Sequence, residues 1–340
     1  MKAFRSALAL SAAAAVSVGA SLGIAAPSAL PAARSSLRGA PAREDEMARI
    51  ATVAFGRSGK LRAVFADPVR PLDLPLVWAE NSPADVWYTW QALSGTRSPG
   101  LLGRTRLSLG IVTPPANGIW HLRLSSGAWA QDVDGLSVIT RVPFDLKRDG
   151  YLNGYHIGRY PTEGEVRADE YAPPQGFIEV TPENQDTRVS EHFRLRDFLT
   201  KDQFEVWPKY LALDLRLVDK LELVMQELNA MGVRAERFAI MSGYRTPQYN
   251  GPGGDGRARL SRHMYGDASD VWVDNDGDGR MDDLNGDGAS DERDGEVIRR
   301  AVERVEAAHP DLIGGCGVYL SSDTHGPFVH VDARGFRARW

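Results

Sequence analysis

Short apolar or alternating runs fill the chain between residues 60 and 161. Gly, Pro, Asn or Ser separates each run from the next. Runs of this length and spacing are typical of consecutive β-strands, so they predict an all-β, sandwich-like domain over residues 60–160. The clearest runs cover residues 60–66, 72–79, 86–93, 104–114, 118–124 and 136–143.

Five of the eight tryptophans lie in this β-rich region. A sugar-binding face is one interpretation of such a concentration. Aromatic packing in a small β core is the commoner use of these residues, and we favour it. The five are Trp78, Trp87, Trp90, Trp120 and Trp129.

The pattern changes to a helical period in the second half of the chain. Between residues 213 and 231 apolar residues recur every three or four positions, and Gly232 is suited to end a helix there. A second helix is expected over residues 294–308. Residues 187–340 are therefore predicted to form an α+β domain, which a linker over residues 161–186 joins to the β-rich part. Its expected strands are residues 237–241, 318–320 and 328–332.

Residues 1–33 have the layout of a secretory signal peptide. Lys2 and Arg5 precede an Ala-rich apolar run, and small residues follow it near Ala26. An uncleaved membrane anchor is the alternative, but the run is weakly hydrophobic for a span. We expect export to the periplasm, cell wall or extracellular space, a flexible lead-in over residues 34–59, and no transmembrane span after signal removal.

Composition further limits the class of protein, its partners and its possible disulfides. A hydrophobic content of 43% and a charged content of 25% are ordinary for a globular protein. A net charge of −5 without a basic face argues against a nucleic-acid partner. Cys316 is the only cysteine, so no internal disulfide forms. It could be a fourth metal ligand or a reactive thiol, but a small buried residue is the favoured interpretation.

A candidate metal site comes from His263, Asp270 and the distant His330. Two imidazoles and a carboxylate can hold Zn²⁺, and three protein ligands leave a fourth position for water, as in catalytic zinc sites. Gly266 and Ala268 lie between the first two ligands, where bulky side chains would hinder folding around an ion. Spacing alone is weak support, because His and Asp seven residues apart also occur by chance.

Three segments, in the same order, resemble the zinc D-Ala-D-Ala carboxypeptidases, which belong to a wider group with lysostaphin and the hedgehog signalling domain. Residues 242–245 read Ser-Gly-Tyr-Arg, which is similar to a segment of that family. Residues 263–270 read His-x-x-Gly-x-Ala-x-Asp and resemble its first zinc motif, and residues 328–332, Phe-Val-His-Val-Asp, resemble the strand with its last ligand. The resemblance covers roughly residues 187–340. It implies a catalytic domain of the hedgehog/D-Ala-D-Ala peptidase type with zinc on His263, Asp270 and His330.

The resemblance also implies roles around the ion. Arg245 would stabilise developing negative charge or anchor a substrate carboxylate. His325, five residues before the last ligand, matches a histidine of some of these carboxypeptidases and is the expected general acid–base. Other relatives place a Glu or a His nearer the last ligand, but Pro327 and Phe328 occupy those positions here. Asp332 is expected to orient a ligand imidazole.

An acidic insertion over residues 274–294 follows the second ligand. Residues 274–282 place Asp at alternate positions with Gly at the sixth, as in the first half of an EF-hand calcium loop. A second copy begins at Asp283. A calcium-binding loop is favoured over a solvated acidic loop, because so many carboxylates repel one another without a counter-ion. The expected ligands are Asp274, Asp276, Asp278, Asp282, Asp283, Asn285, Asp287, Asp291 and Asp294.

The combined expectation is an exported zinc metallopeptidase with a structural calcium ion, which hydrolyses amide bonds in peptidoglycan stem peptides. The sequence does not separate carboxypeptidase from DD- or LD-endopeptidase action. Two alternatives stay open: a non-catalytic module that retains zinc and binds cell wall or signals, and a calcium-dependent adhesion protein. Peptidoglycan peptides are the expected partner.

Overall fold

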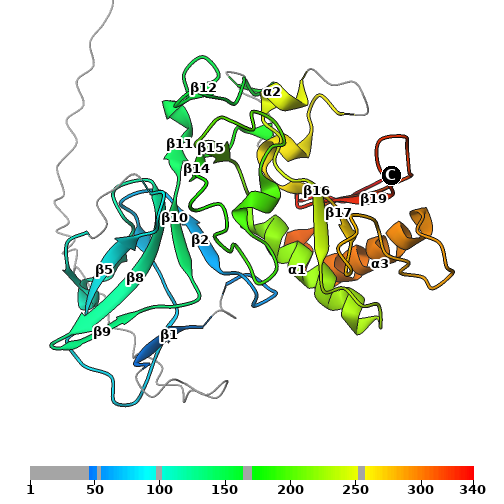
Figure 1. The fold of residues 1–340 in the computed structure, drawn as a ribbon. Helices are drawn as coiled ribbons and strands as arrows, with labels where there is room; N and C mark the ends of the chain where they lie inside the picture. Colours follow the sequence, from blue (N-terminus) through cyan, green and yellow to red (C-terminus); the bar gives the residue numbers. More distant parts are fainter. Residues whose placement is uncertain (1–45, 52–54, 97–101, 164–170, 252–256) are drawn as a thin grey trace, which may run out of the picture. The chain divides into compact units, whose positions relative to one another are not determined.

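The structure is a computed structural model that describes residues 46–51, 55–96, 102–163, 171–251 and 257–340 (Figure 1). The predicted signal peptide and the first part of the predicted lead-in lie outside these residues. All described residues belong to one compact unit. Within the described ranges, no helix has the length and apolar character needed to cross a membrane.

One six-stranded sheet organises the β-rich region. Its strand order is β2-β10-β8-β5-β6, with β9 also paired to β8. The β2–β10 pair is parallel and the other pairs are antiparallel. Each of the six predicted runs contains a strand, whereas β9, only four residues long, was not predicted. The strands are β1 (Ala48–Ile50), β2 (Ala63–Ala66), β3 (Pro71–Leu72), β4 (Leu76–Trp78), β5 (Trp87–Ala92), β6 (Thr105–Arg106), β7 (Ile111–Val112), β8 (Gly118–Ser126), β9 (Trp129–Asp132) and β10 (Ser137–Thr140).

Two of the five tryptophans of this region are core residues. Trp90 and Trp120 are buried, and each indole N–H finds an acceptor. Trp90 Nε1 donates to the carbonyl of Val112 at 2.8 Å, and Trp120 Nε1 donates to Thr140 Oγ1 at 2.9 Å. Buried indoles that satisfy their one donor pack as ordinary core residues. The packing interpretation is confirmed for these two.

Two segments differ from the sequence-based division. Part of the predicted flexible lead-in forms β1, which pairs antiparallel with β4 and buries Ala48 and Ile50. Part of the predicted linker forms β14 (Gly176–Val180), which is buried along its whole length. It lies between β11 and β15, so both edges are paired and both faces are covered. The sequence of residues 173–182 is compatible with a connecting strand or an extended linker, and the structure has the strand. β1 was not expected, because it is short and its partner β4 is distant in the chain.

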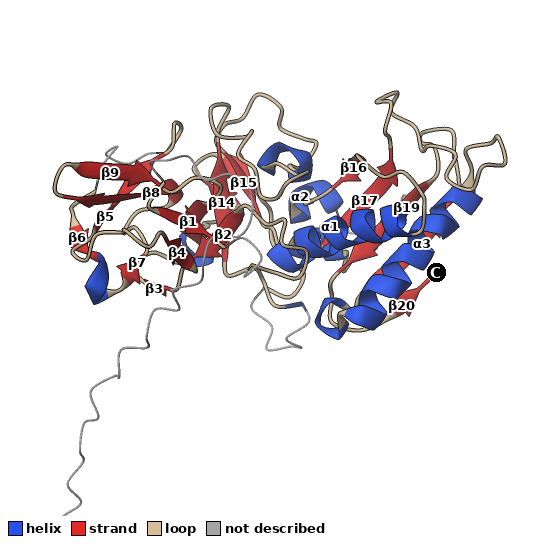
Figure 2. Ribbon diagram, turned by 90° about the horizontal axis from the view of Figure 1, so that it is seen from below, coloured by secondary structure: helices blue, strands red, loops and turns tan. Residues whose placement is uncertain are grey.

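A five-stranded sheet, β16-β17-β19-β18-β20, carries the C-terminal region. Figure 2 shows α1 and α3 lying side by side across one face of this sheet, where they contact each other and β19. This region thus combines strands with helices, and the specific fold type implied by the resemblance stays a prediction. The remaining strands and helices are β11 (Val142–Pro143), β12 (Tyr151–Leu152), β13 (Tyr155–His156), β15 (Lys209–Leu211), α1 (Leu215–Ala230), β16 (Phe238–Ser242), α2 (Pro247–Asn250), β17 (Ala268–Val273), α3 (Glu292–Ala308), β18 (Gly315–Tyr319), β19 (Phe328–Asp332) and β20 (Ala338–Arg339).

A buried ion pair joins the two helices to the end of β19. Lys220 of α1 donates to Glu306 of α3 at 2.7 Å and to the carbonyl of Asp332 at 2.7 Å. Lys220 is completely buried, and a buried ammonium is tolerated only when it is paired and hydrogen-bonded. The pair therefore fixes the helices against the strand that carries His330.

Candidate metal centre

The fold brings His263, Asp270 and His330 together. His263 belongs to a 3₁₀ turn, Arg262–Tyr265, and Gly266 reverses the chain into β17 with a φ of 75°. Asp270 on β17 lies directly opposite His330 on β19 in the antiparallel register. Directly opposite residues point to the same face of a sheet, so the two side chains meet. The turn then adds His263 from the side.

The distances between the three groups fit one metal ion. His263 Nε2 lies 3.2 Å from Asp270 Oδ1 and 3.2 Å from His330 Nδ1. His330 Nδ1 lies 3.0 Å from Asp270 Oδ1. Ligands about 2.0–2.1 Å from a tetrahedral zinc ion lie about 3.3 Å from one another. All three groups are buried, so they are also shielded from competing water.

In His263 and His330, the ring nitrogen that faces away from the site donates a hydrogen bond, and this bond fixes the tautomer of each ring. His263 Nδ1 donates to the carbonyl of Gly243 at 2.7 Å, and His330 Nε2 donates to Asp332 Oδ2 at 3.0 Å. The lone pairs of His263 Nε2 and His330 Nδ1 therefore face each other and the Asp270 carboxylate. Such a set of acceptors is stable only with a cation between them. The donor set fits zinc.

The charges of the site agree with this geometry. Burial alone would raise the pKa of Asp270, but the two imidazoles hold it well below its usual range. Burial alone would lower the pKa of His330, but hydrogen bonds to Asp270 and Asp332 raise it to about 9. Burial lowers the pKa of His263 and keeps that ring neutral. The negative charge of the carboxylates beside the two imidazoles therefore makes the site attractive to a cation.

Asp332 has the orienting position expected from the sequence. Besides His330, it accepts from the backbone N–H of Gly315 at 2.7 Å and pairs with the guanidinium of Arg334. A carboxylate held by so many donors cannot turn away from the imidazole. Arg334 was not predicted, although its place two residues after Asp332 in the chain is a signal that could have been used.

Replacing Asp332 by Asn is expected to weaken zinc binding about 10- to 100-fold, the usual cost of losing such a partner. The amide keeps the size of the carboxylate but loses its charge and one acceptor oxygen. Competition with a chromophoric zinc chelator measures the change. Asp267→Asn is the matched control, since Asp267 is an equally buried carboxylate that pairs with Arg262. Equal zinc affinity in the two variants would contradict the orienting role.

Arg245 makes a contact that the sequence did not suggest. Its Nη2 donates to Asp270 Oδ2 at 2.5 Å, and its Nε donates to Ser242 Oγ at 2.7 Å. The guanidinium thus occupies the second carboxylate oxygen and leaves Oδ1 facing the two imidazoles. Arg245 positions a candidate ligand, and it also lines the adjoining cavity.

His325 and Cys316 do not join His263, Asp270 and His330 in the metal group. His325 is partly buried in the loop before β19, where its ring packs against Phe328 and Nδ1 donates to the carbonyl of Gly326 at 2.8 Å. It is not among the described residues that line the cavity. Cys316 pairs with Val331, so it lies on the opposite face from His330, and burial raises the pKa of its thiol to about 12. The structure therefore favours a buried structural cysteine over a fourth ligand.

The three groups open onto a cavity of about 420 Å³. Its wall includes Trp340, whose ring lies 5.2 Å from that of His330 and whose Nε1 donates to Tyr319 Oη at 2.7 Å. Sequence reasoning missed Trp340, since nothing local marks it as part of a site. The lining residues are Tyr171, Arg245, Arg257, Ala258, Leu260, Ser261, Arg262, His263, Asp270, Tyr319, Phe328, His330, Arg334 and Trp340.

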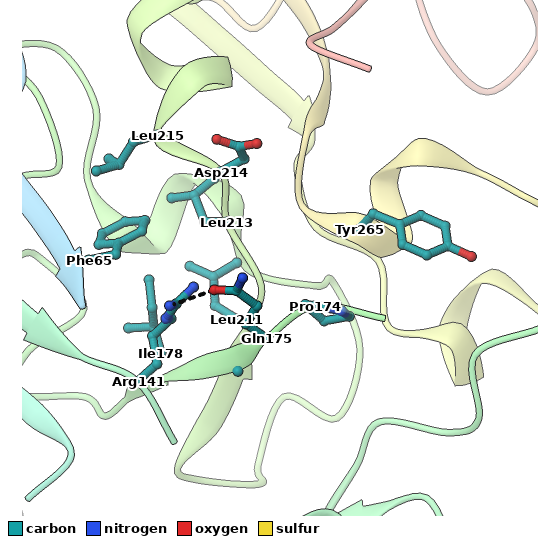
Figure 3. A pocket seen from close by; sticks show the side chains of 11 residues that line it. Phe65, Arg141, Pro174, Gln175, Ile178, Leu211, Leu213, Asp214, Leu215 and Tyr265 are labelled. Carbon is teal, nitrogen blue, oxygen red and sulfur yellow. Dashed lines mark hydrogen bonds between the residues drawn. The ribbon is translucent and has the colours of Figure 1, made fainter. Parts of the chain in front are cut away.

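Figure 3 shows a second cavity, of about 390 Å³, with Phe65, Leu213 and Tyr265 in its wall. Asp214 is the only carboxylate that lines it, and this residue caps α1 and pairs with Arg216. A single, already paired carboxylate cannot hold a metal or perform acid–base chemistry by itself. We therefore place the candidate site at His263, Asp270 and His330.

The acidic insertion brings together only some of its predicted ligands. Carboxylate oxygens of Asp274, Asp276 and Asp282 lie within 4.8 Å of one another. Among the described residues, the remaining Asp side chains of the insertion form no comparable group. Asp283 and Asp294 instead accept backbone N–H groups of their own loop.

Comparison with known proteins adds no relative. No family model, no curated protein and no solved structure matches this chain. Function must therefore be argued from the site itself.

Proposed function

We propose that the chain is a zinc-dependent peptidase that hydrolyses amide bonds in peptidoglycan stem peptides. The convergence of two imidazole lone pairs and one carboxylate oxygen, 3.0–3.2 Å apart, is the observation that carries the proposal. All three groups line one cavity, so an ion held there would be reached from that cavity. Three protein ligands and an open side characterise catalytic rather than structural zinc sites.

The chain's own residues orient the candidate metal ligands and shield them from water. When bound, zinc acts as a Lewis acid on a carbonyl oxygen and yields a nucleophile from water at neutral pH. Arg245 keeps Asp270 turned toward the imidazoles, and Asp332 does the same for His330. Tyr319 and Phe328, stacked with ring centroids 4.6 Å apart, form an apolar wall beside them. A wall of this kind excludes water and strengthens the electrostatic interactions of a site.

The cavity also supports an anionic peptide as substrate. Four arginines line it, and Asp270, a candidate metal ligand, is the one carboxylate among the described residues of the lining. Arg257 stacks on Tyr249 at 4.6 Å, which holds a guanidinium at the rim. A guanidinium binds a carboxylate through two parallel hydrogen bonds. Together with the family resemblance and the expected export, this lining supports peptidoglycan stem peptides, cleaved by carboxypeptidase or endopeptidase action.

A second candidate function rests on a specific observation. Among the described residues, the cavity lining contains no Glu, and its only histidines are His263 and His330. A hydrolase needs a proton carrier near the reacting atoms. A binding or signalling module that retains zinc does not, so this function is the main competitor.

One experiment separates the two. The purified protein is incubated with isolated wall peptides, with and without a zinc chelator, and the fragments are identified by mass. Cleavage that the chelator abolishes and added zinc restores is the expected result. Zinc retained at one ion per chain without any cleavage would favour the binding module. The masses of the fragments also distinguish removal of a terminal residue from internal cleavage.

The variant His325→Ala tests the proton carrier suggested by the sequence. Loss of a general acid–base is expected to lower turnover about 10²- to 10⁴-fold. Zinc content should stay the same, because the hydrogen bond of the His325 ring is to Gly326 and not to any of the three candidate ligands. Turnover and bound zinc are measured on the same preparation. Unchanged turnover would remove His325 from the mechanism while leaving the metal centre intact.

A further inference from the structure

A second group of carboxylates lies where β17 ends. Asp274 is the first residue after this strand, and Asp276 and Asp282 follow in the same loop. Oxygens of the three carboxylates lie within 4.8 Å of one another. Three negative charges at this spacing repel, so a cation or strong donors must compensate them.

The described residues compensate Asp274 only in part. Its side chain is only 2% exposed, and its Oδ1 is shielded from solvent and accepts no hydrogen bond from them. The guanidinium of Arg237 forms an ion pair with the other oxygen, Oδ2, at 3.7 Å, which is beyond hydrogen-bond distance. Buried carboxylates without partners are rare in folded proteins, because desolvation of a charge is costly. An unpartnered oxygen of a buried carboxylate in a group of three indicates a missing ligand.

The other two carboxylates are held in place around Asp274. Asn275 donates to Asp282 Oδ2 from its backbone N–H at 3.1 Å and from its side chain at 2.7 Å. Asp276 Oδ1 accepts the backbone N–H of Asp278 at 3.1 Å. These bonds orient the carboxylates before any ion arrives, which reduces the entropic cost of binding.

We propose that Asp274, Asp276 and Asp282 bind a calcium ion at the end of β17. Calcium takes six to eight oxygen ligands in flexible geometry, and every donor here is an oxygen. Zinc would instead select nitrogen or sulfur donors. The inference goes beyond the proposed peptidase activity and does not depend on it.

The second acidic copy provides a contrast within the same chain. Asp283 accepts the backbone N–H groups of Gly286 and Gly288, at 2.7 and 2.8 Å. Asp287 pairs with the guanidinium of Arg293 at 2.8 Å. The protein itself supplies donors to these carboxylates, whereas it supplies none to Asp274 Oδ1.

A calcium ion at this place would act on the metal centre through one strand. Asp270 and Asp274 lie at two points of the same chain segment, four residues apart. The backbone N–H of Asp274 donates to the carbonyl of Arg237 at 3.0 Å, and the backbone N–H of Asp282 donates to the carbonyl of Val273 at 2.9 Å. The ion would therefore fasten the end of β17 to the loop that follows it.

The test uses the full chain, loaded with zinc and freed of calcium, and titrates it with calcium chloride in a calorimeter. Asp276→Asn is the main variant, because Asp276 is exposed and its replacement leaves the core unchanged. It should bind one calcium ion fewer per chain than the unchanged protein and should lose the calcium-induced rise in melting temperature. Asp287→Asn is the matched control, with the same substitution in the second copy.

Three outcomes would overturn the site. One is an unchanged calcium stoichiometry in Asp276→Asn, and another is the absence of calcium binding at millimolar concentration in the unchanged protein. The third is loss of a calcium ion in Asp287→Asn while Asp276→Asn keeps its full number. Wall-peptide cleavage is measured on the same samples with zinc held constant. Because calcium binding is counted directly, a failure of the peptidase proposal would not alter the result.

Discussion

A chain with His263 replaced by Ala is expected to fold, to lose stoichiometric zinc and to cleave wall peptides no faster than the background. Removing an outer partner of a metal ligand already costs about 10- to 100-fold in affinity, so removing a ligand should cost more than 100-fold. Asp270 and His330 would remain as two ligands, which hold zinc poorly. Zinc per chain after dialysis, measured by atomic emission, and peptide turnover are the two readouts.

The control for this substitution is His309→Ala. His309 follows α3 and is partly buried, but it belongs neither to the metal group nor to the described lining of the cavity. It should retain one zinc ion and unchanged turnover. Full zinc retention in His263→Ala would contradict the proposed ligand set. Full retention of zinc together with loss of turnover would move His263 from metal binding to another role in catalysis.

The candidate ligands could be predicted because their signals are local. His263 and Asp270 are separated by a short turn, and the resemblance ties both to the strand with His330. Strand alternation explains the rest: in the β17–β19 pair, Asp270 and His330 stand opposite each other, as one face of an antiparallel sheet requires. The helix predicted over residues 213–231 is likewise found as α1, because its apolar spacing and its Gly232 stop are sequence features.

Contacts between distant parts of the chain could not be predicted. Trp340 reaches His330 because Gly317, the residue opposite His330 on β18, leaves room for the indole. Lys220 supports the end of β19 from a helix more than a hundred residues earlier in the chain. The pattern of β14 shows only a short apolar run, and its burial depends on both neighbouring strands. Such features depend on tertiary packing, which a local pattern does not contain.

For Arg245 and His325, the family resemblance predicted a role, but the contacts in the structure differ from those the role implies. Arg245 was expected to contact substrate, but in the structure its guanidinium holds Asp270. His325 was expected beside the metal, but its side chain is hydrogen-bonded to Gly326 within its own loop. In both cases the sequence identifies a residue type suited to the chemistry. The direction of a side chain depends on rotamers and neighbours that the motif does not specify.

Gly266→Ala is expected to destabilise the protein by about 2–5 kcal/mol, through a strained backbone and a steric clash that add. Gly266 has a φ of 75°, a conformation that costs an L-residue about 1–2 kcal/mol. A Cβ at this position would lie 2.4 Å from the carbonyl oxygen of Ala212, and a backbone atom cannot rotate away. The turn also separates His263 from Asp270, so zinc affinity should fall together with stability. Urea unfolding of the zinc-free and the zinc-loaded protein measures both effects.

Gly232→Ala separates the two costs. Gly232 follows α1 with a φ of 82°, but a Cβ there would meet no atom within 4 Å. The Gly232→Ala substitution should therefore destabilise the protein only through the strained backbone, by about 1–2 kcal/mol, and should leave zinc binding unchanged. The difference between the two variants gives the energy of the close contact between the metal-site turn and Ala212. If both variants lose the same stability and keep the same zinc affinity, that contact does not position the turn, and the geometry of His263 must depend on its bond to Gly243.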